Sequence, residues 1–83
     1  MLSTDPELSL NVRRVIAKIL NVSLDDILPE MAFGDIPQWD SMGHMEVMLA
    51  LEEDFQVPVN AVTIGELVSV PTIVEFISKN QHA

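Results

Sequence analysis

The sequence of 83 residues contains no cysteine and no tyrosine, and aromatic residues make up only 5% of it. The lack of cysteine excludes disulfide bonds, a thiol nucleophile and thiolate ligands for a metal. A chain of this length buries only about 60% of its unfolded surface, so without disulfides it depends on a dense apolar core. Hydrophobic residues make up 48% of the chain, which favours such a core over disorder. We therefore expect one small ordered domain over residues 1–83 rather than an aromatic-rich β-sandwich.

Basic residues are also scarce, and residues 19–78 contain no lysine or arginine although they hold eleven acidic residues. The formal net charge is −9, and the bases are Arg13, Arg14, Lys18 and Lys79. Such a surface repels nucleic acid and anionic membranes and attracts proteins with basic patches. The N-terminus has no basic segment followed by an apolar one, and no hydrophobic run is long enough to span a membrane. We expect a cytoplasmic monomer that binds neither nucleic acid nor membrane.

Local signals predict four helices. Asp5, Pro6 and Glu7 are typical of a helix start, and apolar residues then recur at three- and four-residue steps as far as Leu20, before Asn21. The expected helices span residues 6–20, 41–55 with Asp40 as N-cap, 60–67, and 71–80 capped by Ser69 or Val70. The third is short, and its β-branched residues and glycine are poor helix formers. The sequence therefore predicts an all-α four-helix bundle with three main helices and one short third helix.

A long connection over residues 21–39 separates the first two helices. Ser23 is placed to cap a single helical turn within it. Connections of this length usually dock onto the domain, so we expect apolar side chains to anchor it. The candidate anchors are Ile27, Leu28, Met31, Phe33 and Trp39.

The second helix has two apolar stripes, where a surface helix needs only one. The first consists of Val47, Met48, Leu51 and Phe55, the second of Met42, Met45 and Leu49, and the acids flanking the second are Glu46, Glu52 and Glu53. Adaptable apolar side chains ringed by carboxylates are typical of a docking surface. The alternative is a central helix that buries both stripes. The three glutamates argue against this alternative, because carboxylates are costly to bury.

Ser41 lies at the start of this helix, beside unsatisfied backbone N–H groups and the positive end of the helix dipole. A phosphate on its hydroxyl would be favourably placed there. An Asp-Ser pair at a helix start is usually only a cap, so it becomes informative together with the acidic apolar stripe that follows.

These segments resemble the acyl carrier proteins and related phosphopantetheine carriers. Asp40-Ser41-Met42 is similar to their Asp-Ser-Leu motif, residues 46–55 are similar to the helix that follows it, and residues 70–77 to the final helix. The likeness runs without a gap from about residue 40 to residue 77 and is weaker over the first helix.

The resemblance implies a carrier and not an enzyme. Ser41 would receive a 4′-phosphopantetheine arm from coenzyme A through a phosphopantetheinyl transferase, and Asp40 would help to present it. The other partners would be acyl-transferring or acyl-activating enzymes with basic docking patches, and no metal site or catalytic residue is expected in the chain itself. The positions that match the family's partner-recognition face are Met42, Met45, Glu46, Leu49, Glu52 and Glu53. The positions that match its core face, where an acyl chain can be held, are Val47, Leu51 and Phe55.

Several residues depart from the pattern of the fatty-acid carriers: Gln38-Trp39 precedes the motif, and Met42 and Gly43-His44 follow Ser41. The pathway therefore stays open between fatty-acid, modified-lipid and polyketide-type biosynthesis. The alternatives are a peptidyl or D-alanyl carrier and an unmodified helical protein-interaction module. A Ser41–His44 dyad lacks an orienting acid and an oxyanion loop, so we expect His44 to be an exposed residue near Ser41.

The uncompensated acids predict a salt-dependent stability. Mutual repulsion among them should weaken the fold at low ionic strength, and added NaCl or MgCl2 should screen it. We expect the Tm to rise with salt, by about 4–8 °C for each ~1 kcal/mol of repulsion removed. Thermal unfolding followed by circular dichroism over a salt series measures this, and a Tm indifferent to ionic strength would contradict it.

Overall fold

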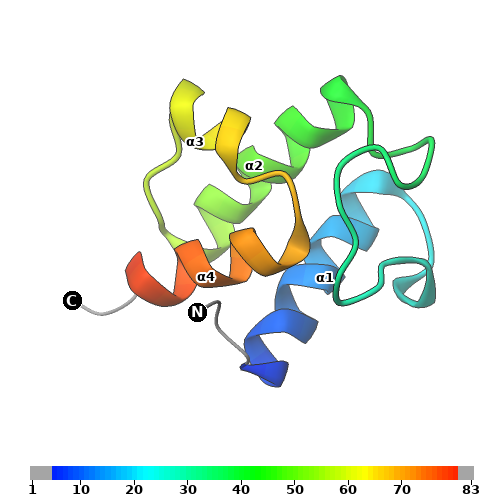
Figure 1. Cartoon of the computed structure of the whole chain (residues 1–83), viewed down its shortest axis with the longest axis horizontal. Coiled ribbons are helices and arrows are strands. Elements are labelled where there is room, and N and C mark those ends of the chain that lie inside the picture. Colours follow the sequence, from blue (N-terminus) through cyan, green and yellow to red (C-terminus); the bar gives the residue numbers. More distant parts are fainter. Residues whose placement is uncertain (1–4, 81–83) are drawn as a thin grey trace.

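The computed structural model describes residues 5–80, which form four α-helices joined by loops (Figure 1). The elements are α1 (Pro6–Leu20), a 3₁₀ turn η1 (Leu24–Asp26), α2 (Ser41–Phe55), α3 (Ala61–Glu66) and α4 (Val70–Asn80). The predicted all-α bundle with a short third helix is confirmed. None of the helices within residues 5–80 is long and apolar enough to cross a membrane.

Each helix begins at a polar side chain that satisfies backbone N–H groups of its first turn. The Asp5 carboxylate accepts from the amides of Glu7 and Leu8, and the Asp40 carboxylate accepts from the amide of Gly43. Ser69 is the cap of α4, because its hydroxyl accepts the Thr72 amide at 3.2 Å. The predicted ends of α1 and α2 are confirmed to the residue. Asn21 and Gln56 end these helices in the left-handed conformation, with φ of 58° and 55°.

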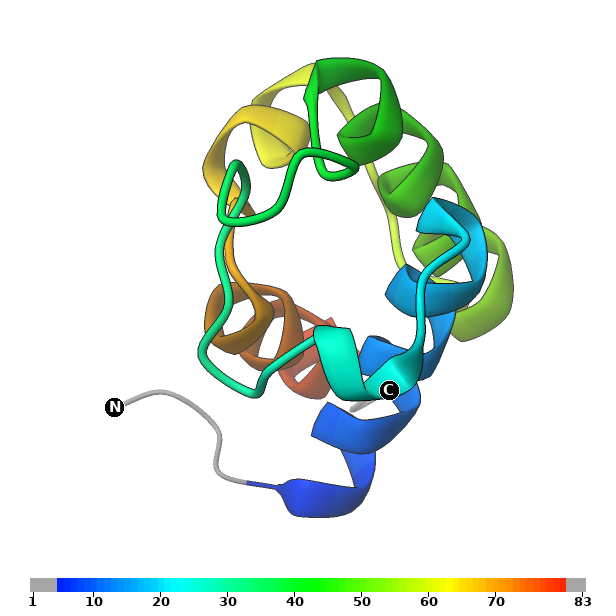
Figure 2. The same cartoon turned by 90° about the vertical axis from the view of Figure 1, so that its right-hand side faces the viewer.

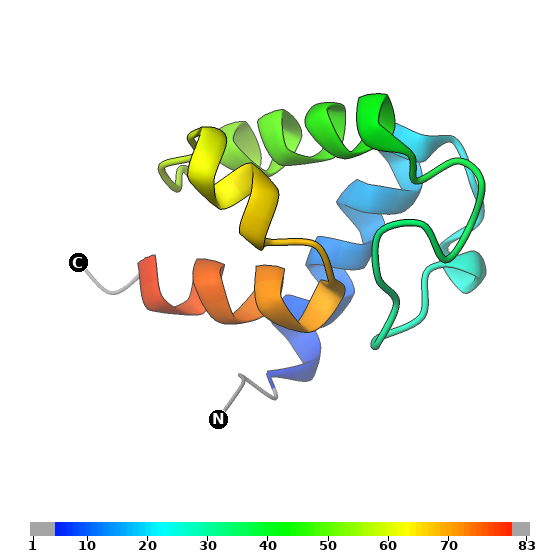
Figure 3. The same cartoon turned by 45° about the horizontal axis from the view of Figure 1, so that its top comes forward.

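The core lies between α1, α2 and α4, and Figure 3 shows α3 set between α2 and α4. Only the first stripe of α2 enters the core. The side chains of Met42, Met45 and Leu49 are 74%, 50% and 54% exposed. The alternative in which α2 buries both stripes is therefore wrong.

The connection between α1 and α2 is anchored by three of its five candidate side chains. Ile27, Met31 and Trp39 are buried, as predicted. Leu28 is 57% exposed, because it follows Ile27 in extended backbone, where successive side chains point to opposite sides. Phe33 is 39% exposed and sets its ring edge against His44 instead of entering the core. The predicted roles of Leu28 and Phe33 as core anchors are wrong.

A short backbone bridge ties this connection to the turn between α3 and α4. The Phe33 amide donates to the Val68 carbonyl at 2.7 Å, and the Val70 amide donates to the Met31 carbonyl at 2.8 Å. Figure 2 shows the connection passing beside the segment that leads into α4. The bridge brings Phe33 and Val68 together on the side of the bundle where α2 begins.

Candidate functional site

Ser41 is the first residue of α2, and its side chain is exposed. The residue before it fixes the start of the helix: Asp40 Oδ1 accepts the Gly43 amide at 2.8 Å, and the Asp40 carbonyl accepts the His44 amide at 2.8 Å. The hydroxyl therefore lies at the positive end of the α2 dipole, on a helix start held by two hydrogen bonds.

A mostly apolar groove of about 280 Å³ adjoins Ser41. Its walls come from α2, α3, the α1–α2 connection and the α3–α4 turn. The lining residues are Phe33, Ser41, His44, Met45, Ile64, Gly65 and Val68. The backbone bridge between the two loops thus builds one wall of the groove beside the candidate site.

His44 is buried and not exposed, which corrects the prediction from the sequence. Its side chain is only 4% exposed, and both ring nitrogens form hydrogen bonds. The Trp39 indole N–H donates to Nδ1 at 3.0 Å, and Nε2 lies 2.9 Å from the Ile64 carbonyl oxygen. An indole nitrogen can only donate and a carbonyl can only accept, so the ring is neutral with its proton on Nε2.

This arrangement also excludes a Ser41–His44 dyad, because neither ring nitrogen is free to take a proton from a hydroxyl. A signal for the burial was present in the sequence. His44 precedes Val47, Met48 and Leu51 by three, four and seven residues, so it continues the core stripe of α2. The helical period places its ring beside the core, and hydrogen bonds with Trp39 and Ile64 satisfy both ring nitrogens there.

The exposed face of α2 carries the predicted docking residues. Met42, Met45 and Leu49 are exposed together with Glu46 and Glu53. Glu52 is half-buried, and its carboxylate accepts the Val59 amide at 3.2 Å. Five of the six predicted residues therefore share an open acidic and apolar surface, whereas Glu52 also holds the loop between α2 and α3.

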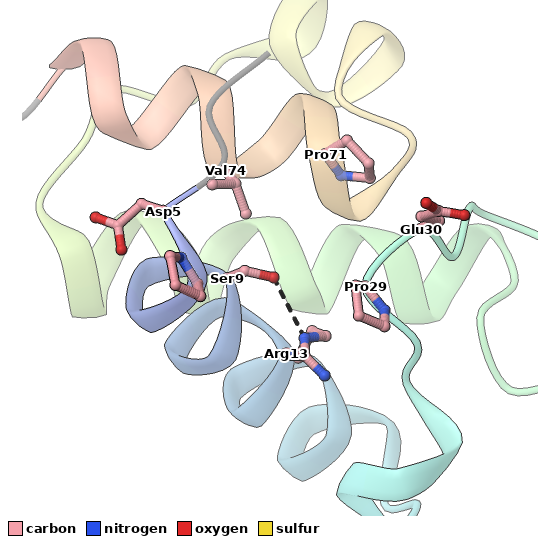
Figure 4. Close-up of a pocket in the computed structure, with 8 residues that line it drawn as sticks. Asp5, Ser9, Arg13, Pro29, Glu30, Pro71 and Val74 are labelled. Carbon is pink, nitrogen blue, oxygen red and sulfur yellow. Dashed lines mark hydrogen bonds between the residues drawn. The ribbon is translucent and has the colours of Figure 1, made fainter.

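A second hollow, of about 330 Å³, lies between α1, the connection and the start of α4 (Figure 4). Arg13 donates from Nε to the Ser9 hydroxyl at 3.3 Å inside it, and Asp5 and Glu30 also line it. It shares no lining residue with the groove beside Ser41. Within residues 5–80, no group of three or more histidine and acidic side chains is arranged to hold a metal ion.

Gly43 is required by the close approach of α2 to its surroundings, a role that the sequence analysis missed. A Cβ at this position would lie 2.6 Å from the Gln38 carbonyl oxygen and 2.8 Å from Leu20 Cδ2. The first of these contacts is with backbone, which cannot move aside without shifting the segment that leads into Asp40. The lack of a side chain at Gly43 thus allows the start of α2 to lie against the end of α1.

Residues 11–77 match the model of a family described as PP-binding, phosphopantetheine attachment site. The chain is 28% identical over 67 residues to the acyl carrier protein of Buchnera aphidicola subsp. Schizaphis graminum (strain Sg), covering 81% of this chain and 85% of that protein. It is 29% identical over 72 residues to the acyl carrier protein of Thermosynechococcus vestitus (strain NIES-2133 / IAM M-273 / BP-1), covering 87% and 89%.

The packing at Gly43 predicts that Gly43→Ala destabilises the protein. Overpacking against backbone costs about 1–3 kcal/mol, which outweighs the gain in helix propensity of ~1 kcal/mol. Gly65→Ala is the matched control, because a Cβ there meets nothing within 4 Å and the residue is also helical. We expect urea unfolding to give a lower free energy of unfolding for the first variant and an equal or higher one for the second. Similar effects of the two substitutions would contradict the close approach.

Proposed function

The chain belongs to the acyl carrier protein family, and from that premise we propose that it holds acyl intermediates on an arm attached to Ser41. It is a carrier and not an enzyme, and the cofactor of this family is covalently attached 4′-phosphopantetheine. Its partners are a phosphopantetheinyl transferase and acyl-handling enzymes. We further propose that residues 1–83 act as a single carrier domain in fatty-acid, modified-lipid or polyketide-type biosynthesis.

The observation that carries this proposal is the exposure of Ser41 at the capped start of α2, beside an apolar groove. A phosphodiester needs an accessible hydroxyl, and its negative charge is favoured at a helix N-terminus. A flexible arm also needs a surface to lie along, and Phe33, Met45 and Val68 offer one next to the hydroxyl. The residues present therefore fit the group. When bound, it supplies the thiol that the cysteine-free chain lacks and on which an acyl group is held as a thioester.

Ser41 has one chemical task in this proposal. Its oxygen attacks the phosphorus next to the pantetheine group of coenzyme A, and a new P–O bond forms as the pyrophosphate bond breaks. Adenosine 3′,5′-bisphosphate leaves, and the hydroxyl proton passes to a base other than His44, since both nitrogens of that ring are engaged elsewhere. Asp40 supports the reaction by holding the first turn of α2 in place.

The exposed face of α2 is the surface that we propose for partner enzymes. Methionine side chains adapt to different apolar contacts, and the carboxylates of Glu46 and Glu53 attract basic patches over a longer range. Both acids lie on the stripe of Met42 and Leu49, which runs away from Ser41 along the helix. A partner that docks there reaches the attachment site at the same time.

The proposal predicts that Ser41 alone accepts the arm. Incubation of the protein with coenzyme A and a broad-specificity phosphopantetheinyl transferase should add the mass of one phosphopantetheinyl group. We expect Ser41→Ala to abolish this gain completely and Ser23→Ala, at another exposed serine, to leave it intact. Intact-protein mass spectrometry measures both. An unchanged mass of the wild-type protein with several transferases would favour the unmodified interaction module.

The docking face predicts a charge-dependent affinity for the transferase. Glu46→Lys and Glu53→Lys should each raise the KM at low ionic strength by roughly three- to tenfold, about 1 kcal/mol, because each reverses a charge that a basic partner meets. Asp54→Lys makes the same charge change on another side of α2 and serves as the control. Steady-state kinetics measure docking through the KM, and urea unfolding measures the stability of each variant separately. Equal KM values for all three variants would argue against this face.

A further inference from the structure

The side chain of His44 lies in the contact between α2 and α3, the α2–α3 seam. The imidazole forms one wall of the groove beside Ser41, and the Phe33 ring stands edge-on to it with 5.4 Å between the ring centroids. Its Nε2–H meets the Ile64 carbonyl of α3, and its Nδ1 meets the indole of Trp39. One side chain thus joins α3, α2 and the connection at the inner wall of the groove.

The contact with His44 holds α3 in addition to the partly buried side chain of Ile64, which packs against the core. The helix has six residues, and none of them is fully buried. The Ile64 carbonyl lies near its C-terminal end, where helical carbonyls lack partners within the helix. The amide that would normally reach Ile64, that of Val68, bonds to the Glu66 carbonyl instead. His44 therefore caps the end of α3 and holds the helix against α2.

The core lies directly behind this wall. Trp39 is fully buried, and Val47 and Met48 on the next turn of α2 are also buried. A hydrocarbon chain entering from the groove would have to part α2 from α3 beside His44. The hydrogen bond between Nε2 and the Ile64 carbonyl would then break, leaving both groups without partners in an apolar interior.

We infer that His44 keeps the acyl group out of the core, so that the cargo lies in the surface groove formed by Phe33, Met45, Ile64 and Val68. This inference rests on the proposed function, since it concerns a group carried on Ser41. It assigns His44 a role as a specificity-determining residue. Cargo on this carrier is held by contacts at the surface, where partner enzymes can reach its whole length, and extra methylene groups gain no burial inside the bundle.

Trp39 is the only tryptophan of the chain and lies against His44, so its fluorescence reports on the seam. The full-length protein is loaded by a broad-specificity transferase with acetyl-, octanoyl- or 8-bromooctanoyl-phosphopantetheine from the corresponding coenzyme A esters. Bromine quenches an indole only on close approach. We expect the octanoyl and 8-bromooctanoyl forms of the wild type to have equal emission, and the difference in Tm between the acetyl and octanoyl forms to be smaller in the wild type than in His44→Ala.

His44→Ala removes the wall, and in this variant we expect the bromine to quench Trp39 and the octanoyl form to melt at a higher temperature than the acetyl form. Val62→Ala is the control, because it truncates a side chain of α3 that is 66% exposed, and it should behave as the wild type. If His44→Ala does not fold, the quenching comparison in the wild type still tests the inference, since it needs only the native chain.

Quenching in the wild type would overturn the inference while leaving the carrier role intact. Loaded His44→Ala that folds but shows neither effect would also overturn it. A protein that gains no mass with any ester would reject the carrier role itself, and with it the assignment of His44. Mass spectrometry of each sample therefore distinguishes failure of the inference from failure of the proposed function.

Discussion

The position of α3 depends on the hydrogen bonds that run from the indole of Trp39 through His44 to the carbonyl of Ile64. Each bond contributes only about 0.5–1.5 kcal/mol net, but a buried polar group left without its partner costs about 1–3 kcal/mol. Losing the imidazole would leave the indole N–H and the Ile64 carbonyl unsatisfied together. Because α3 has no fully buried side chain, only partly buried side chains such as Ile64 would then hold it to the core. The wall of the groove between α2 and α3 is therefore held by this side chain, and the opposite wall by the backbone bridge.

Two constraints near the start of α2 complement these bonds. Asp40 holds the first turn through its carboxylate and its carbonyl, and Gly43 lets that turn lie against the carbonyl of Gln38 and the side chain of Leu20. A serine placed in this way has a defined position although its side chain is exposed. The position of the proposed attachment site therefore comes from contacts beneath the hydroxyl, and the surface around it stays open.

The sequence predicted what is encoded locally. Caps such as Asp5 and Asp40 gave the starts of α1 and α2, and the spacing of apolar residues gave the buried stripe of α2 and its exposed neighbour. Features that depend on contacts between distant segments were not predictable in this way. The partner of His44 on α3 is a backbone carbonyl 20 residues along the chain, and a carbonyl leaves no trace in residue identity. The need for Gly43 likewise arises only once the end of α1 meets the start of α2.

The backbone bridge between the α1–α2 connection and the α3–α4 turn has a consequence for how the protein opens. Its two hydrogen bonds join Met31 and Phe33 to Val70 and Val68, across more than a third of the sequence. Local fluctuations of one loop must therefore break contacts with the other, and the two segments should exchange their amide hydrogens as one cooperative unit. The wall of the groove that these two segments form would then keep one conformation, because neither segment can change its backbone without the other. Each enzyme that binds the carrier would meet the same surface there.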